Sequence, residues 1–116
     1  MNFRIIGLNV LAHDIHQNAL NKGFWEQSQF LGYTNDAAIR VALVHSECSE
    51  LLEAIRKNIK TSEHVPEITG AEEECADTII RLLDMAAGYG WDIEKSIELK
   101  MNYNLGRGHM HGNKAF

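Results

Sequence analysis

Two pairs of acidic residues share the same short spacing in different parts of the chain. Glu47 and Glu50 are three residues apart, and Glu74 and Asp77 repeat that spacing. Residues three apart lie on one face of an α-helix, so the two carboxylates of each pair can act on the same ligand. Four close carboxylates repel one another, and a hard divalent cation such as Mg²⁺, for which Mn²⁺ can substitute, relieves that repulsion through oxygen ligands. The spacing therefore predicts a metal site, if two helices bring the pairs together.

The helical positions of two of these acids favour a site over an ordinary solvated surface. Glu47 falls at the edge of the apolar side of its helix, and Asp77 borders Ile80 on the next one. A single pair of this kind is usually a solvated helix face. Two pairs at apolar boundaries favour metal binding, whereas ion pairs with arginines such as Arg40 or Arg81 are the alternative way to neutralise the acids.

A stripe of polar residues near the C-terminus suits phosphate oxygens. Lys100, Asn104 and Arg107 follow i, i+4, i+7 spacing, and Tyr103 lies beside them. The two cations and the amide can donate hydrogen bonds to phosphate, although the alternative is an ordinary polar helix face. Together with the acids, the stripe indicates phosphoryl chemistry. A carboxylate orients a water for attack on phosphorus, while the metal neutralises charge on the phosphate oxygens and the leaving group.

Helices must position these residues, because apolar residues recur at three-to-four spacing along most of the chain and no segment alternates as a strand does. Thr69 and Glu72 have the spacing of a capping box, and Asp92 can cap the last helix. Pro66 falls in the one sizeable loop, so an antiparallel hairpin through that loop makes the two acid pairs face each other. The expected helices run over about 8–22, from after Thr34 and Asn35 to 59, over 69–87 and over 92–104.

Composition places limits on the size and the partners of the protein. A chain of 116 residues with 45% hydrophobic content can bury one modest core, so a single all-α domain over residues 1–116 is expected. The net charge of −5 argues against binding to a DNA or RNA duplex, which attracts basic surfaces. No membrane-spanning stretch or signal peptide is evident, which predicts a soluble, cytoplasmic protein with no membrane partner.

Three segments carry a resemblance to a known family. They are HSECSELLEAIRKN (residues 45–58), EEECADTIIRLLDMAAGYGWD (72–92) and KMNYNLGRGHMHGNKAF (100–116). These segments resemble the MazG-like members of the all-α nucleoside triphosphate pyrophosphohydrolases. Upstream, IHQNALNKGFWE (15–26) is similar to the N-terminal helix and aromatic segment of that family, so the resemblance covers nearly the whole chain after about Asn9.

The resemblance implies a four-helix MazG-like bundle completed by oligomerisation, as a homodimer or homotetramer. It implies a Mg²⁺-dependent enzyme that hydrolyses a nucleoside triphosphate between the α and β phosphates, giving the monophosphate and pyrophosphate. The implied catalytic and metal-binding residues are Glu47, Glu50, Glu74 and Asp77; the implied substrate-binding residues are Lys100, Tyr103, Asn104 and Arg107 at the triphosphate and Trp25, with Phe24 and Asn18, at the base. In the closing tail, Ala115 replaces a lysine that is frequent in the family, which leaves Lys114 for any phosphate contact.

Two other interpretations compete with this one. A zinc site would use histidines and cysteines, but their spacing matches no zinc finger, and Cys48 points into the apolar side of its helix, which favours a buried thiol for it and for Cys75. The other alternative is a non-catalytic helical module that binds a nucleotide or a protein without cleaving anything. Pyrophosphate release with and without Mg²⁺ separates the module from the enzyme. The candidate zinc ligands are His45, Cys48, Cys75, His109 and His111.

Overall fold

The computed structural model describes residues 2–107. Within that range the chain is all-helical, with four α-helices, one short 3-10 helix and no strand, as the sequence predicts. The elements are α1 (Leu8–Asn21), the 3-10 helix η1 (Glu26–Phe30), α2 (Tyr33–Arg56), α3 (Gly70–Gly88) and α4 (Ile93–Leu105).

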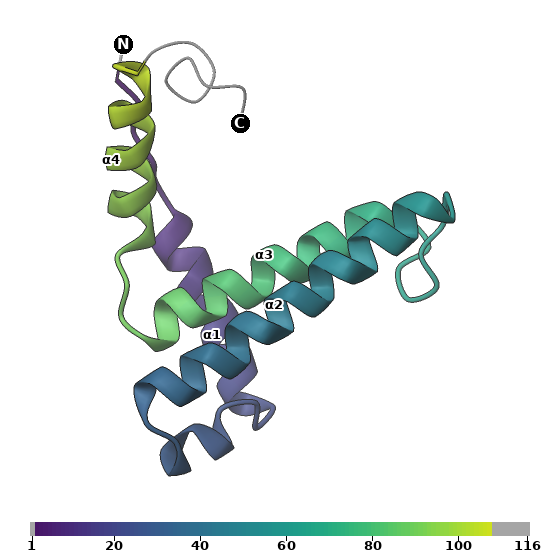
Figure 1. Cartoon of the computed structure of the whole chain (residues 1–116), viewed down its shortest axis with the longest axis horizontal. Coiled ribbons are helices and arrows are strands. Elements are labelled where there is room, and N and C mark those ends of the chain that lie inside the picture. Colours follow the sequence, from purple (N-terminus) through teal and green to yellow (C-terminus); the bar gives the residue numbers. More distant parts are fainter. Residues whose placement is uncertain (1, 108–116) are drawn as a thin grey trace.

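α2 and α3 form the expected antiparallel hairpin, and Figure 1 shows them side by side along most of their length. The loop that joins them closes through hydrogen bonds, including one from the Gly70 N–H to the Ile59 carbonyl at 3.0 Å. Gly70 is needed at this junction because a Cβ there would lie 2.8 Å from the Cβ of Ile59. The hairpin therefore brings the residues of the two acid pairs onto facing helices.

Local capping sets the starts of the last two helices, as predicted. The Thr69 hydroxyl accepts the Glu72 N–H at 3.1 Å, and the Glu72 carboxylate accepts the Thr69 N–H at 3.0 Å, which completes the capping box. The Asp92 carboxylate accepts the Lys95 N–H at 3.1 Å and caps α4.

The bounds of α2 differ from the predicted ones. The helix begins at Tyr33, after Gly32, so neither Thr34 nor Asn35 serves as its cap. It ends at Arg56 and not at Ile59, because Asn58 adopts a positive φ of 50° that turns the chain. Ile59 fits the apolar period of the helix but lies beyond its end, where its side chain packs against Gly70 at the start of α3.

The helices do not form a compact four-helix bundle within one chain. α1 packs on α3, while α4 packs mainly against α1 and the N-terminal segment, where Ile5 N–H donates to the Glu98 carboxylate at 3.0 Å. Figure 1 shows α4 standing away from the α2–α3 pair. The radius of gyration is 16.7 Å, whereas a compact chain of this length has about 13 Å.

Few apolar side chains are buried, and much apolar surface faces outward. The buried ones are Ala12, Ala19, Ala54, Leu83, Met85 and Ala86. Cys48 and Cys75 are both exposed, so the prediction of buried thiols is wrong. For Cys48 the reason is that the apolar side of α2 is wider than the surface that α3 covers. Among the described residues, no helix combines the length and the apolar character needed to cross a membrane.

Candidate active site

Three of the four predicted acids meet between α2 and α3. Glu47 projects from α2, and Glu74 and Asp77 project from α3. One carboxylate oxygen from each lies within 4.8 Å of the others, and all three residues are half-buried. These three residues are called the acid triad below. Three carboxylate oxygens at this spacing match the ligands that Mg²⁺ prefers.

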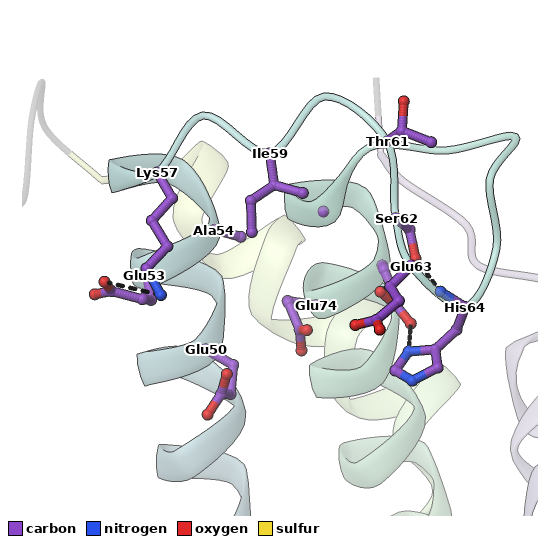
Figure 2. A pocket seen from close by; sticks show the side chains of 12 residues that line it. Glu50, Glu53, Ala54, Lys57, Ile59, Thr61, Ser62, Glu63, His64 and Glu74 are labelled. Atoms are coloured by element: carbon purple, nitrogen blue, oxygen red, sulfur yellow. Dashed lines mark hydrogen bonds and ion pairs between the residues drawn. The ribbon is translucent and has the colours of Figure 1, made fainter.

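Glu50, the fourth acid, is exposed and lies one helical turn along α2 from Glu47. It lines a pocket of about 350 Å³ that also contains Glu74 and the loop between α2 and α3. Figure 2 shows Glu50 and Glu74 on the two helices that flank this pocket. Glu50 is therefore next to the acid triad without belonging to it.

Burial and mutual repulsion raise the pKa values of two acids of the triad. Burial first, and then the charges of Asp77 and Glu47, raise the pKa of Glu74 above its usual value. Burial followed by the charge of Glu47 raises the pKa of Asp77, against the opposing effect of the Arg81 guanidinium. A bound cation would offset this repulsion.

One arginine already compensates part of the triad. The Nε–H of Arg81 on α3 donates to Oε1 of Glu47 on α2 at 2.8 Å. Arg40, the other arginine considered from the sequence, pairs with Asp36 at 3.0 Å. Of the two ion-pair alternatives, the structure therefore makes the one through Arg81, and only Glu47 of the triad takes part in it.

A cleft of about 380 Å³ opens on the other side of the triad, between α1 and the α2–α3 pair. That volume is in the range of small-molecule sites, roughly 300–1,000 Å³. Glu47 and Asp77 of the triad line the cleft, and Asn18 lines it from α1, where the family resemblance places a base contact. The other lining residues are Ile15, Ala19, Phe24, Ile80, Arg81 and Asp84.

Trp25 is packed between the helices and does not line this cleft, whereas its neighbour Phe24 does and is 66% exposed. The indole N–H of Trp25 donates to both carboxylate oxygens of Asp84, at 3.0 Å each. The guanidinium of Arg40 covers the indole ring at 3.4 Å from its centroid. Gly88 makes room for the ring, because a Cβ there would lie 2.4 Å from it.

The C-terminal stripe gathers around Tyr103, away from the triad. Nζ of Lys100 lies 4.8 Å from the Tyr103 ring centroid, and the guanidinium of Arg107 lies 5.9 Å from it. Asn104 is exposed on the same helix. No α4 residue lines either pocket beside the triad. The structure therefore brings the stripe together but does not bring it to the acids of the same chain.

The residues considered for zinc do not assemble in the part of the chain that the structure describes. Across residues 2–107, the acid triad is the only group of three or more potential metal ligands whose atoms lie within 4.8 Å of one another. His45, Cys48 and Cys75 do not belong to it. His109, His111, Lys114 and Ala115 lie outside the described residues.

Two residues of the cleft, Arg81 and Asp84, were not assigned to the site from the sequence. Their spacing from Asp77, at i+4 and i+7, places them on the same face of α3 and is the signal that identifies them. No protein-family model, curated protein or solved structure matches this chain. The function must therefore be inferred from the chemistry of the triad and the cleft.

Proposed function

We propose that the protein is a Mg²⁺-dependent nucleoside triphosphate pyrophosphohydrolase of the MazG-like type, which converts a ribo- or deoxyribonucleoside triphosphate to the monophosphate and pyrophosphate. The observation that carries this proposal is a triad of carboxylates within 4.8 Å of one another, two of which line a cleft of nucleoside size. All donors of the triad are carboxylate oxygens, which suits Mg²⁺ or Mn²⁺.

In this proposal Glu47, Glu74 and Asp77 hold the metal, which neutralises charge on the phosphate oxygens and on the leaving pyrophosphate. Glu50 lies beside the triad, and its exposed carboxylate orients a water and accepts its proton. The water oxygen bonds to the α-phosphorus, and the bond from that phosphorus to the oxygen bridging to the β-phosphate breaks. The electron pair of that bond leaves with pyrophosphate.

The nucleoside end of the substrate extends from the triad into the cleft. The exposed ring of Phe24 offers an aromatic face to a base, and the Asn18 amide offers one donor and one acceptor. Trp25 contributes indirectly, because its indole N–H fixes the Asp84 carboxylate at the cleft wall. The triphosphate end then lies over the triad.

A second copy of the chain completes the site in this proposal, as a homodimer or homotetramer. The stripe of Lys100, Asn104 and Arg107 lies too far along α4 to act on the acids of its own chain, so it serves the triad of a neighbouring copy. An apolar groove of about 290 Å³ between α1, α3 and α4 supports such contact, since exposed apolar surface favours association. Its lining residues are Leu8, Ile79, Leu82, Leu83, Ala86, Trp91, Ile93 and Ile97.

The experiment is a pyrophosphate-release assay on a panel of ribo- and deoxyribonucleoside triphosphates with Mg²⁺, with Mn²⁺ and with chelator. We expect monophosphate and pyrophosphate only when a divalent cation is present. Diphosphate plus orthophosphate would show that the assigned bond is wrong, and turnover in chelator would contradict the metal mechanism. Tight nucleotide binding without turnover would support the non-catalytic module instead. Glu67→Gln, in the exposed α2–α3 loop, is the matched control that keeps activity.

A further inference from the structure

The cleft beside the triad is also lined by a carboxylate outside the triad, that of Asp84. Asp84 follows Asp77 by seven residues on α3. Seven residues make almost two full turns, so the two side chains share one face of the helix at a separation of about 10 Å along its axis. Ile15 and Ile80 line the cleft together with them. The cleft therefore has acidic groups separated by almost two turns of α3, and apolar side chains line it with them.

The Asp84 carboxylate is held in a fixed orientation. His16 Nδ1 lies 2.8 Å from Oδ1, and the Trp25 indole N–H is shared between the two oxygens at 3.0 Å each. The side chains of Asp84 and His16 are only 13% and 15% exposed. Among the described residues, Oδ2 receives no donor besides this shared indole, and a carboxylate oxygen has room for two. Oδ2 can therefore accept a further hydrogen bond from a ligand in the cleft.

The separation of about 10 Å between Asp77 and Asp84 along α3 suits the substrate of the proposed reaction. A nucleotide whose α-phosphate lies over the triad would extend its sugar and base along the cleft, toward Asp84. A fixed carboxylate accepts hydrogen bonds and donates none. The base that meets it must present a donor, and a carbonyl oxygen in that place would leave both oxygens unsatisfied and repelling each other.

We propose that Asp84 is a specificity-determining residue that accepts the exocyclic amino group of cytosine or adenine and disfavours uracil and thymine, which present a carbonyl oxygen at that position. This inference rests on the proposed function. Cytosine and adenine present an amino donor where thymine presents a carbonyl oxygen. The carboxylate therefore makes a hydrogen bond with the first two bases and a repulsive contact with the third. Asn18 lines the same cleft and can pair with the remaining edge of the base in either orientation of its amide.

The matched substrates dCTP and dUTP test this selection, because they differ in the amino or carbonyl group at one position of the base. We expect the protein to favour dCTP in kcat/KM by roughly 10- to 100-fold, the range for a hydrogen bond to a charged group. Asp84→Asn should narrow or reverse the ratio, since a carboxamide can donate to the carbonyl oxygen of dUTP. Asp14→Asn, on an exposed position of α1 outside the cleft, should leave the ratio unchanged.

A second variant covers the case in which Asp84→Asn fails to fold. Asp84→Glu keeps the charge but moves the acceptor by one methylene, so it should lower kcat/KM for dCTP and still reject dUTP. Melting curves identify which variants are folded. Equal kcat/KM for dCTP and dUTP in the parent protein, or an unchanged dCTP preference in folded Asp84→Asn, would overturn the assignment of Asp84.

Binding measurements separate this inference from the proposed reaction. Calorimetry with the non-hydrolysable α,β-imido analogues of dCTP and dUTP reports selection without turnover. If the protein hydrolyses no triphosphate but binds the dCTP analogue more tightly, the reaction is wrong and the role of Asp84 stands. If it hydrolyses both substrates equally, the reaction stands and the role of Asp84 is wrong. Binding of neither analogue would overturn both.

Discussion

Arg81 and Glu47 bridge α2 and α3 through a hydrogen bond of 2.8 Å between the arginine Nε–H and the carboxylate Oε1. This ion pair sits at the wall of the cleft and involves one member of the acid triad. Arg81 thus stands in for part of the positive charge that a bound Mg²⁺ would supply. A metal that draws Glu47 away leaves the guanidinium able to meet a phosphate oxygen.

Arg81→Gln should destabilise the metal-free protein and increase its response to Mg²⁺. The Arg81 side chain is 41% exposed, so the expected loss is modest, about 1 kcal/mol. The measurement is a pair of melting curves, with chelator and with excess Mg²⁺. Arg56→Gln, which removes a more exposed pair with Glu53 on the same hairpin, is the control and should change neither curve by more than about 0.5 kcal/mol. Equal Mg²⁺ shifts in the parent and in Arg81→Gln would contradict the exchange of Arg81 for metal.

Glu74→Gln tests the repulsion within the triad, because Glu74 belongs to no ion pair among the described residues. Its folded-state pKa is raised, by burial first. In chelator, the stability of the parent should therefore fall as the pH rises through that raised pKa. The variant should show a smaller fall, because only the raised pKa of Asp77 remains, and should be as stable as the parent or more so. The variant should also lose the Mg²⁺ shift and on the order of 1,000-fold in kcat. Urea unfolding from pH 4 upward and the assay measure these effects, with Glu67→Gln as the control. If the variant unfolds more easily in chelator and keeps its turnover, the assignment of Glu74 to the site is wrong.

Lys100→Ala and Arg107→Ala should weaken triphosphate binding by roughly 10- to 100-fold and leave Mg²⁺ binding by the free protein unchanged. The reason is that these cations are proposed to meet phosphate and not the metal. Unchanged KM and kcat in both variants would show that the stripe is an ordinary solvated helix face. Lys95→Ala, at an exposed position of α4 nearer its start, is the control.

Mixing two impaired variants, at a substrate concentration where neither is active alone, tests whether the stripe serves a neighbouring copy. Glu74→Gln lacks an acid of the triad, and Lys100→Ala lacks a cation of the stripe. If one copy supplies the acids and another the cations, mixed oligomers contain an intact site and recover part of the parent activity. No recovery after subunit exchange, verified by mass, would contradict the shared site.

A pH-dependent loss of stability at alkaline pH should trace to Tyr89. Its hydroxyl donates to the buried Asp36 carboxylate, and burial together with this bond raises the pKa of Tyr89 from 10.0 to about 12. The folded state thus holds the phenolic proton more strongly than the unfolded state does. Stability from this group is complete below pH 10 and is lost as the pH rises through about 12.

Tyr89→Phe should remove this alkaline loss and cost about 1 kcal/mol at neutral pH, since Asp36 keeps its bonds from Ser28 and Arg40. Urea unfolding at pH 8 and at pH 11 provides the measurement. Tyr103→Phe is the control, because Tyr103 is 63% exposed on α4. A variant that keeps the alkaline loss would assign the effect to another group.

Local sequence signals predicted the parts of the fold that local interactions determine. The capping box at Thr69 and the cap at Asp92 form between residues three apart, so spacing alone identified both helix starts. The end of α2 was mispredicted because Ile59 fits the apolar period, while its packing against Gly70 depends on the returning helix. A contact made only after the chain folds back leaves no local signal.

The acids of the site were predictable for the same reason, and the cleft was not. The spacing from Glu74 to Asp77 places both on one face of α3, and the hairpin then brings Glu47 opposite them. The exposure of Cys48 depends on how much of α2 is covered by α3, and the placement of Trp25 beside Asp84 on how α1 packs against α3. Helix crossings of this kind follow from side-chain packing over the whole chain.

Gly88 packs against the Trp25 ring and does not line the cleft. Its missing side chain leaves the space that lets the indole reach Asp84. A single methyl group, as in Gly88→Ala, would push the indole outward and free the carboxylate to rotate. Under the proposed role of Asp84, the packing of this one glycine would therefore influence substrate selectivity through a change that contacts neither the triad nor the nucleotide.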